Sequence, residues 1–158
     1  MEVEKIAEIL MQREKTVSVA EADTAGLIGY MLGSIPGSSR YFPGGVIAYT
    51  GGLKEKILGV PDDVAPTYGT VSSEMAIGMA RGVRLLTGTD YAVSTTGVTG
   101  PSAGRSGLPV GTFWVGFSVQ DGQSTALHLL LDGDMDFCKR GAAPAALDFL
   151  WAHINDAT

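Results

Sequence analysis

The chain has 158 residues and a net charge of −6, and 45% of its residues are hydrophobic, which is typical of one globular domain spanning 1–158. The acidic balance argues against nucleic acid as a partner, because binding a phosphate backbone needs a basic stripe. The chain has one cysteine, two histidines and no apolar run of the roughly 18 residues that a membrane span needs, so we expect no metal, no cofactor, no membrane partner and a cytoplasmic location.

Helix and strand patterns alternate in the first half of the chain. They predict a helix over 3–14, a strand over 16–20, a helix over 23–32, a strand over 46–50 and a short helix over 53–58. Asp23 or Thr24 caps the second helix in this interpretation, because a short polar side chain there accepts a backbone N–H bond. Gly59 and Pro61 end the short helix.

The second half predicts a long helix, three strands and a final helix. The long helix begins at Ser72 and Ser73 and stops at Gly88. The later elements are strands over 91–95, 111–119 and 125–131, the last two joined through a tight Asp-Gly turn, and a helix over 134–154. The complete pattern predicts an α/β fold, a single domain of three layers (α/β/α) with a mixed sheet.

Three of the predicted strands run into loops rich in glycine, serine or threonine. These loops are AEADTAG at 20–26, AYTGGLK at 48–54 and TTGVTGPSAGRSG at 95–107. Ligands of α/β proteins bind at the carboxyl ends of strands, and glycine lets backbone N–H groups approach a ligand. The glycine spacing fits neither a dinucleotide fingerprint nor a phosphate-binding P-loop. We therefore predict one small-molecule site, in which Ala22, Tyr49, Lys54 and the backbone of 97–101 line one pocket.

Six separated motifs are more specific together than any of them alone. They are AEADTAG, PGSSRYFPGGVIAY, LGVP, YGTVSSEMA, TTGVTGP and LPVGTFWVGF, in that order. Over about residues 3–154 the chain resembles the carboxy-terminal domain of the competence/damage-inducible protein CinA, whose enzymatic members are nicotinamide-nucleotide amidohydrolases. The resemblance implies hydrolysis of the nucleotide amide to the acid and ammonia without a metal. It also implies a serine nucleophile whose proton is handled by a tyrosine and a lysine, which Tyr49 and Lys54 match.

The chain departs from this family at the nucleophile itself. Ala22 stands at the serine position and Asp23 follows it, and a methyl group cannot attack a carbonyl. Further changes at Ala25, Gly51 and Gly52 favour natural divergence over a single engineered substitution. Thr24 is the nearest alternative hydroxyl. Asp23 is either a helix N-cap or the partner of Lys54 in an ion pair.

We expect the ligand to be held by residues of these loops and of the turn before the second strand. Those residues are Asp23, Thr24, Gly26, Ser38, Ser39, Thr96, Gly97, Gly100 and Arg105. Arg105, like Arg40, is a candidate for binding an anion, although solvated surface charge explains both equally simply.

The strand predicted over 111–119 carries more large apolar side chains than an exposed surface tolerates, which predicts at least a homodimer. His128, in an apolar strand, is expected to be a core histidine. Three functions remain open. They are an amidohydrolase with an altered nucleophile, a catalytically silent relative that binds a small metabolite such as a pyridine nucleotide, and a non-catalytic oligomeric interaction protein. The missing hydroxyl favours the second.

Overall fold

The computed structural model describes residues 3–156, apart from the side chain of Arg105. At its centre lies a five-stranded sheet in the order β2-β1-β3-β4-β5. β1 is parallel to β2 and β3, whereas β4 is antiparallel to β3 and β5, so the sheet is mixed. The strands are β1 (Val17–Glu21), β2 (Gly44–Ile47), β3 (Tyr91–Gly97), β4 (Thr112–Val119) and β5 (Thr125–Leu130).

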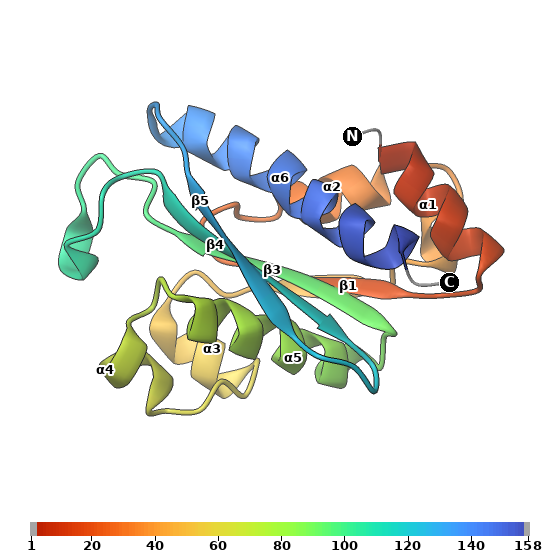
Figure 1. The fold of residues 1–158 in the computed structure, drawn as a ribbon, viewed down its shortest axis with the longest axis horizontal. Helices are drawn as coiled ribbons and strands as arrows, with labels where there is room; N and C mark the ends of the chain where they lie inside the picture. The colour runs from red at the N-terminus through yellow and green to blue at the C-terminus, as the bar shows by residue number, and fades with distance from the viewer. Residues whose placement is uncertain (1–2, 157–158) are drawn as a thin grey trace.

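Helices cover both faces of this sheet, as Figure 1 shows: α1, α2 and α6 lie on one face and α3, α4 and α5 on the other. The predicted three-layer α/β/α fold with a mixed sheet is therefore confirmed. The α-helices are α1 (Val3–Gln12), α2 (Leu27–Gly33), α3 (Gly51–Lys56), α4 (Val64–Tyr68), α5 (Ser73–Thr87) and α6 (Met135–Asn155), and the 3-10 turns are η1 (Ser38–Arg40) and η2 (Gly104–Ser106).

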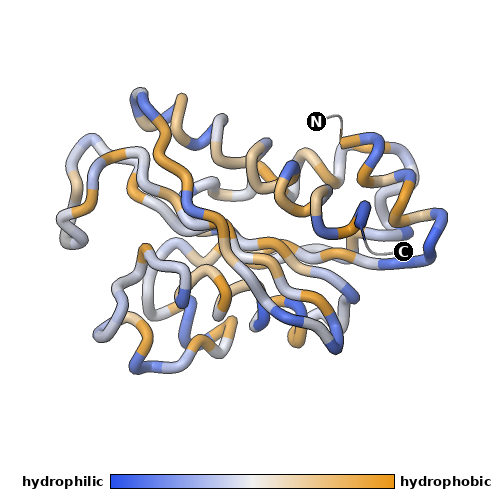
Figure 2. The backbone as a smooth tube through the Cα atoms, in the orientation of Figure 1, coloured by the Kyte–Doolittle hydropathy of each residue, from blue (hydrophilic) through white to orange (hydrophobic). Residues whose placement is uncertain are grey.

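The two faces of the sheet carry side chains of different size. Val19, Val93 and Val115 point into a core of large side chains beneath α1, α2 and α6. Figure 2 shows hydrophobic stretches running through the strands and the helices packed on them. The opposite face is built from small residues, which lets α5 approach the sheet closely. Ser94 Oγ donates to the Ala76 carbonyl oxygen of α5 at 2.6 Å, and a Cβ atom at Gly116 would overlap that same carbonyl.

Local signals in the sequence located several element ends correctly. Ser72 Oγ accepts the Met75 N–H at 3.1 Å as the N-cap of α5, and Gly88 ends that helix with φ of +69°. The second helix starts later than predicted, at Leu27, because residues 22–26 form a turn whose polar side chains bond elsewhere. The short helix α4 was not predicted.

Two expectations about β4 and β5 are wrong. β4 is an interior strand, and its Phe113, Val115 and Phe117 are buried within this chain, so the reason given for a homodimer does not hold and the homodimer stays a prediction. His128 lies exposed on the edge strand β5, with its ring centroid 4.9 Å from that of Trp114. None of the helices in residues 3–156 combines the length and the apolar character needed to cross a membrane.

The close contact between α5 and β4 generates a stability prediction. Gly116→Ala places a methyl group against the Ala76 carbonyl and should lower the free energy of unfolding by roughly 1–3 kcal/mol, as overpacking does. Gly52→Ala in α3 is the matched control, because its Cβ would meet open space. Urea denaturation compares the two, and a Gly116→Ala variant as stable as the parent would contradict the close approach.

Candidate functional site

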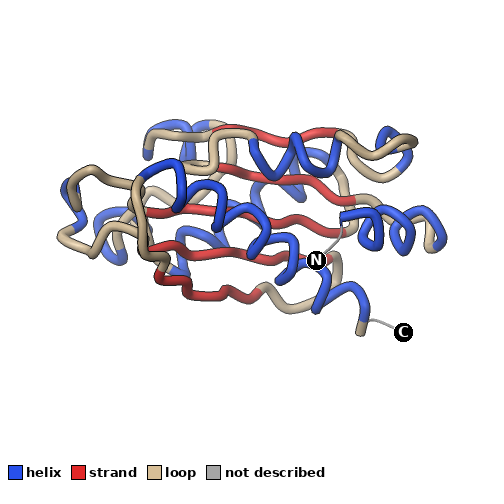
Figure 3. Tube along the Cα trace, turned by 90° about the horizontal axis from the view of Figure 1, so that it is seen from above, coloured by secondary structure: helices blue, strands red, loops and turns tan. Residues whose placement is uncertain are grey.

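The loops after β1, β2 and β3 meet at the carboxyl ends of these parallel strands. Seen from above in Figure 3, loops extend beyond the strands at this end of the molecule. They border a shallow, open pocket of about 260 Å³, here called the strand-end pocket, whose walls include Asp23, Tyr49 and the backbone of 97–100. Such an edge is where α/β folds bind small ligands.

Asp23 is the charged group on the wall of the strand-end pocket. Its Oδ2 accepts the Gly97 N–H at 2.9 Å, so it bridges the ends of β1 and β3. It does not cap α2, whose N-cap is Gly26 at φ of +100°, and the N-cap interpretation is wrong. Burial raises the pKa of Asp23, and the Gly97 N–H and the positive charges of Lys54 and Lys139 partly oppose that rise.

Lys54 lies beneath the pocket and is 3% exposed. Its Nζ donates to Thr96 Oγ1 at 3.1 Å and, more weakly, to the Thr70 carbonyl oxygen at 3.5 Å. Burial lowers the pKa of Lys54 and the charge of Asp23 raises it. The expected ion pair is not a direct one, because no N–O contact within 4.0 Å joins these two described side chains. Burial thus makes the Lys54 amine easier to deprotonate than an exposed lysine, and Asp23 opposes this effect without direct contact.

Thr24 belongs to a closed hydrogen-bond network rather than to the pocket wall. Its Oγ1 donates to Glu21 Oε1 at 2.6 Å and lies 2.7 Å from Thr95 Oγ1, and its side chain is 3% exposed. The Glu21 carboxylate also accepts the N–H groups of Ile28 and Gly29 at 2.9 Å each, which fixes the start of α2. The Thr24 hydroxyl is thus engaged in holding α2 and not free to attack a ligand.

Ala22 does not line the pocket as expected. It is fully buried in a cluster with Ala20, Ala48 and Leu58, and its N–H donates to the Thr95 carbonyl at 3.0 Å. At the position that the family resemblance assigns to the nucleophile, the methyl group is therefore buried and does not reach the wall of the strand-end pocket.

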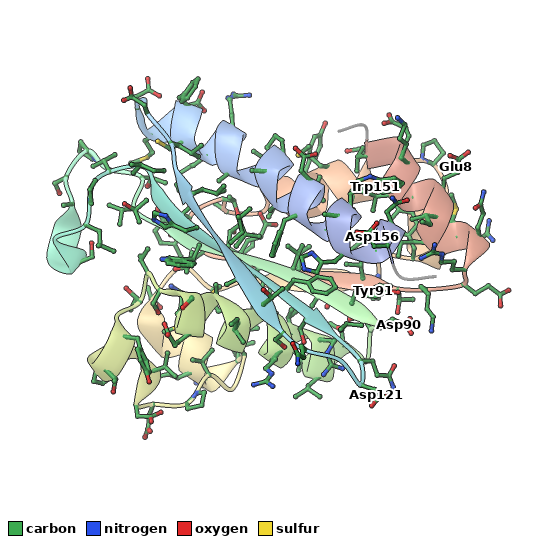
Figure 4. The ribbon with its side chains drawn as sticks, viewed as in Figure 1. Glu8, Asp90, Tyr91, Asp121, Trp151 and Asp156 are labelled. Carbon is green, nitrogen blue, oxygen red and sulfur yellow. The ribbon has the colours of Figure 1, made fainter. Side chains whose placement is uncertain are left out.

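The predicted ligand residues separate into two groups in space. Gly97 and Gly100 line the pocket, and Thr96 lies beneath it as the acceptor for Lys54. Ser38 and Ser39 lie in η1, which precedes β2 and is joined to the amino end of β1 by the bond from Val17 N–H to the Tyr41 carbonyl. Asp90 and Tyr91, labelled in Figure 4, mark this opposite end of the sheet.

Within one chain, therefore, Ser38, Ser39 and Arg40 are not brought to the pocket, and Arg40 instead contacts Met11. Gly26 shapes the turn before α2 and is not part of the pocket wall. Arg105 lies in η2, beside the pocket in the chain, and its side chain is outside the described part of the structure.

Sequence reasoning missed one contributor to the site. Lys139 of α6 places its Nζ 5.3 Å from the centre of the Tyr49 ring, a cation–π contact. No local pattern in the sequence places Lys139 beside Tyr49, because the two residues lie far apart in the chain. The backbone of Thr99 and Gly100, which the sequence predicted at the site, lines the pocket, and the N–H groups of these two residues have no partner among the described residues.

These features define a three-layer α/β domain with a polar binding site at its strand ends. The sequence profile of the CinA C-terminal domain family matches residues 2–154, and the chain belongs to that family. A CinA-like protein of Leptospira biflexa is 37% identical over 95% of this chain, which corresponds to 36% of that protein. The chain thus spans about a third of the length of the curated relatives it matches.

Solved structures confirm the fold. The competence/damage inducible protein CihA of Agrobacterium tumefaciens superposes with a TM-score of 0.88 at 29% identity, covering 99% of this chain and 97% of the other. The competence damage-inducible protein A of Klebsiella pneumoniae superposes with a TM-score of 0.94 at 24% identity, covering 99% and 96%. The second likeness supports the fold alone.

The lowered pKa of Lys54 predicts a specific pH dependence of stability. Between that lowered pKa and the ordinary value of 10.5, the unfolded chain still binds a proton that native Lys54 has released, so the free energy of unfolding rises with pH. The Lys54→Met variant has no amine at this position, so its free energy of unfolding lacks this rise with pH. The stability of the parent relative to Lys54→Met should therefore increase across this window in urea titrations.

Lys56→Met is the matched control, because Lys56 is exposed in the same helix. Its stability should run parallel to that of the parent as the pH rises. Parallel curves for Lys54→Met and the parent would show that the amine has its ordinary pKa and would refute the assignment.

Proposed function

We propose that this protein is a CinA C-terminal domain that lacks serine amidase chemistry and binds a small metabolite in the strand-end pocket. The observation that carries the proposal is the pair of residues at positions 22 and 23, which differ from those that the family resemblance implies. A buried methyl group stands at Ala22, while the Asp23 carboxylate takes the Gly97 N–H beside Lys54. The tyrosine and lysine that the resemblance pairs with a serine are present, and the hydroxyl they would serve is absent.

Replacement nucleophiles are poorly placed. The Thr24 hydroxyl is enclosed between Glu21 and Thr95, and moving it would release the start of α2. Asp23 is tied to Gly97, and its raised pKa reflects a carboxylate that burial disfavours. A nucleophile works best when a base takes its proton and its position faces the ligand. Neither residue meets both conditions.

The pocket keeps groups that suit recognition. The free N–H groups of Thr99 and Gly100 can donate to a carbonyl or carboxamide oxygen, and Tyr49 offers a half-exposed ring. The Asp23 carboxylate disfavours a phosphate beside it, whereas Lys139 supplies a positive charge next to Tyr49. A ligand with a carboxamide in the pocket and its anionic part toward Lys139, such as a pyridine nucleotide, satisfies this pattern.

Binding without turnover is the first testable consequence. Nicotinamide mononucleotide should bind saturably in calorimetry, and Tyr49→Ala should weaken binding roughly 3- to 10-fold through loss of the aromatic contact. Tyr30→Ala is the control, because Tyr30 is 72% exposed on α2 and does not line the pocket. Absence of any heat would favour a non-catalytic interaction protein, and equal binding by both variants would contradict the strand-end pocket as the binding site.

Ammonia release tests the catalytic half of the proposal. We expect negligible turnover of nicotinamide mononucleotide, since losing a nucleophile typically leaves only a residual acceleration, roughly 10³- to 10⁴-fold over water in serine proteases. Ala22→Ser alone should recover little activity, because the charge of Asp23 opposes the lowering of the Lys54 pKa and so makes the amine a poorer base than it would be beside a neutral residue. Ala22→Ser with Asp23→Cys should recover more than either single change.

Robust ammonia release by the unmodified protein would overturn this half of the proposal. Comparing Asp23→Asn with Thr24→Val would then show which of the two side chains performs the attack. Nicotinamide mononucleotide binding should be measured in parallel for each variant. A variant that binds the nucleotide but shows no turnover can then be distinguished from one that has lost the binding site.

A further inference from the structure

A second, larger cavity opens on the α5 face of the sheet. It has a volume of about 550 Å³ and is here called the aromatic pocket, after Trp114 of β4 and His128 of β5 in its wall. Tyr68 at the end of α4 and Glu74 in the first turn of α5 complete its sides. It shares Thr70, Val71 and Ser106 with the strand-end pocket, so the two pockets adjoin.

The aromatic pocket exists because α5 does not cover the amino-terminal end of β4. α5 packs on Gly116 and begins at Ser73. Trp114, two residues from Gly116 and on the same face of the strand, is left partly uncovered at the helix start. Trp114 pairs across the sheet with Thr96, the acceptor for Lys54, and on its other side with His128. Thr96, Trp114 and His128 therefore form one row across three neighbouring strands, and this row runs from beneath the strand-end pocket to the aromatic pocket.

The wall of the aromatic pocket suits a flat ring. The rings of Trp114 and His128 lie 4.9 Å apart between centroids at an angle of 46°, and together they present an aromatic surface. A volume of this size lies within the range of small-ligand sites, and base–aromatic stacking is a strong contribution to binding nucleic-acid bases.

Among the polar side chains that line the aromatic pocket, Glu74 contributes a carboxylate, which is a hydrogen-bond acceptor. Glu74 is exposed, and Ser73 Oγ donates to its Oε2 at 2.9 Å, which leaves its other lone-pair positions open. A carboxylate can accept two parallel N–H bonds from a ring edge that carries adjacent donors. A guanine edge has such a pair, whereas an adenine edge sets a lone pair beside its amino group and would be repelled.

We propose that the aromatic pocket binds a guanine-type ring, stacked against Trp114 and His128 with its N–H donor edge on Glu74. The proposal rests on the proposed function, because it extends the same binding site and makes the ligand bipartite, with a polar group in the strand-end pocket and a donor-bearing base in the aromatic pocket.

Guanosine tests the ring site directly. The chain has two tryptophans, and Trp151 lies on α6, on the other face of the sheet, as Figure 4 shows. In a Trp151→Phe background only Trp114 reports, and guanosine should quench its fluorescence saturably. Calorimetry should then show about tenfold weaker binding or more for Trp114→Ala. Absence of quenching, or equal guanosine affinity after Trp114→Ala, would overturn the proposal.

Glu74 is tested by selectivity. Guanosine should bind at least about tenfold more tightly than adenosine, and Glu74→Gln should remove most of that difference. Equal affinity for the two nucleosides in the parent protein would refute the role of Glu74 and the guanine-type edge. If Trp114→Ala does not fold, His128→Ala takes its place, because His128 is exposed on an edge strand, and unchanged guanosine affinity would again overturn the stacking surface.

Asp23→Asn separates this proposal from the proposed function. Guanosine alone should bind the Asp23→Asn variant as it binds the parent, since Asp23 is not part of the aromatic pocket. Guanosine binding without nicotinamide mononucleotide binding would contradict the pyridine-nucleotide ligand and support the ring site. The reverse result would sustain the strand-end pocket and overturn the ring site.

Discussion

The close approach of α5 to β3 and β4 is the constraint on which the rest of the structure depends. Gly116 and Ser94 leave room for the helix backbone, and Ser94 binds the Ala76 carbonyl within it. Because α5 is fixed in this way, the segment before it is also fixed, and the Thr70 carbonyl receives both the Thr96 hydroxyl and, weakly, the Lys54 ammonium. One helix contact thus sets the floor of the strand-end pocket and the open end of the aromatic pocket.

The electrostatics of the site follow from burying two opposite charges near each other without contact. Burial shifts the pKa of Asp23 upward and that of Lys54 downward. The charge of each residue partly offsets the shift in the pKa of the other. Asp23 keeps its charge stabilised through the Gly97 N–H, whereas Lys54 has neutral acceptors at Thr96 and Thr70. In this chain we infer that the amine chiefly supports the pocket floor.

Much of the fold could be predicted because its signals are local. A serine N-cap and a left-handed glycine mark the ends of α5 at Ser72 and Gly88, and both are legible from neighbouring residues. The site could be predicted only in part, because proximity in space is not local. Ser38 and Ser39 match a family motif yet lie at the amino end of the strands, and Lys139 reaches Tyr49 from the far end of the sequence. His128 stands within the apolar run of 126–131, which is typical of a buried strand, but it lies on an edge strand and is exposed.

Charge placement along the two pockets orients any ligand that fills both. Asp23 and Glu74 put a carboxylate in each pocket, so acceptor-rich groups are disfavoured beside them and donor groups are favoured. Acceptor groups of the ligand can instead accept hydrogen bonds from the N–H groups of Thr99 and Gly100, and an anionic group can pair with the ammonium of Lys139. On the proposed function, divergence at position 23 has therefore changed which charges the site accepts while preserving the backbone that shapes it. On the same proposal, Ala22 accounts for the absent reaction and Asp23 for the choice of ligand.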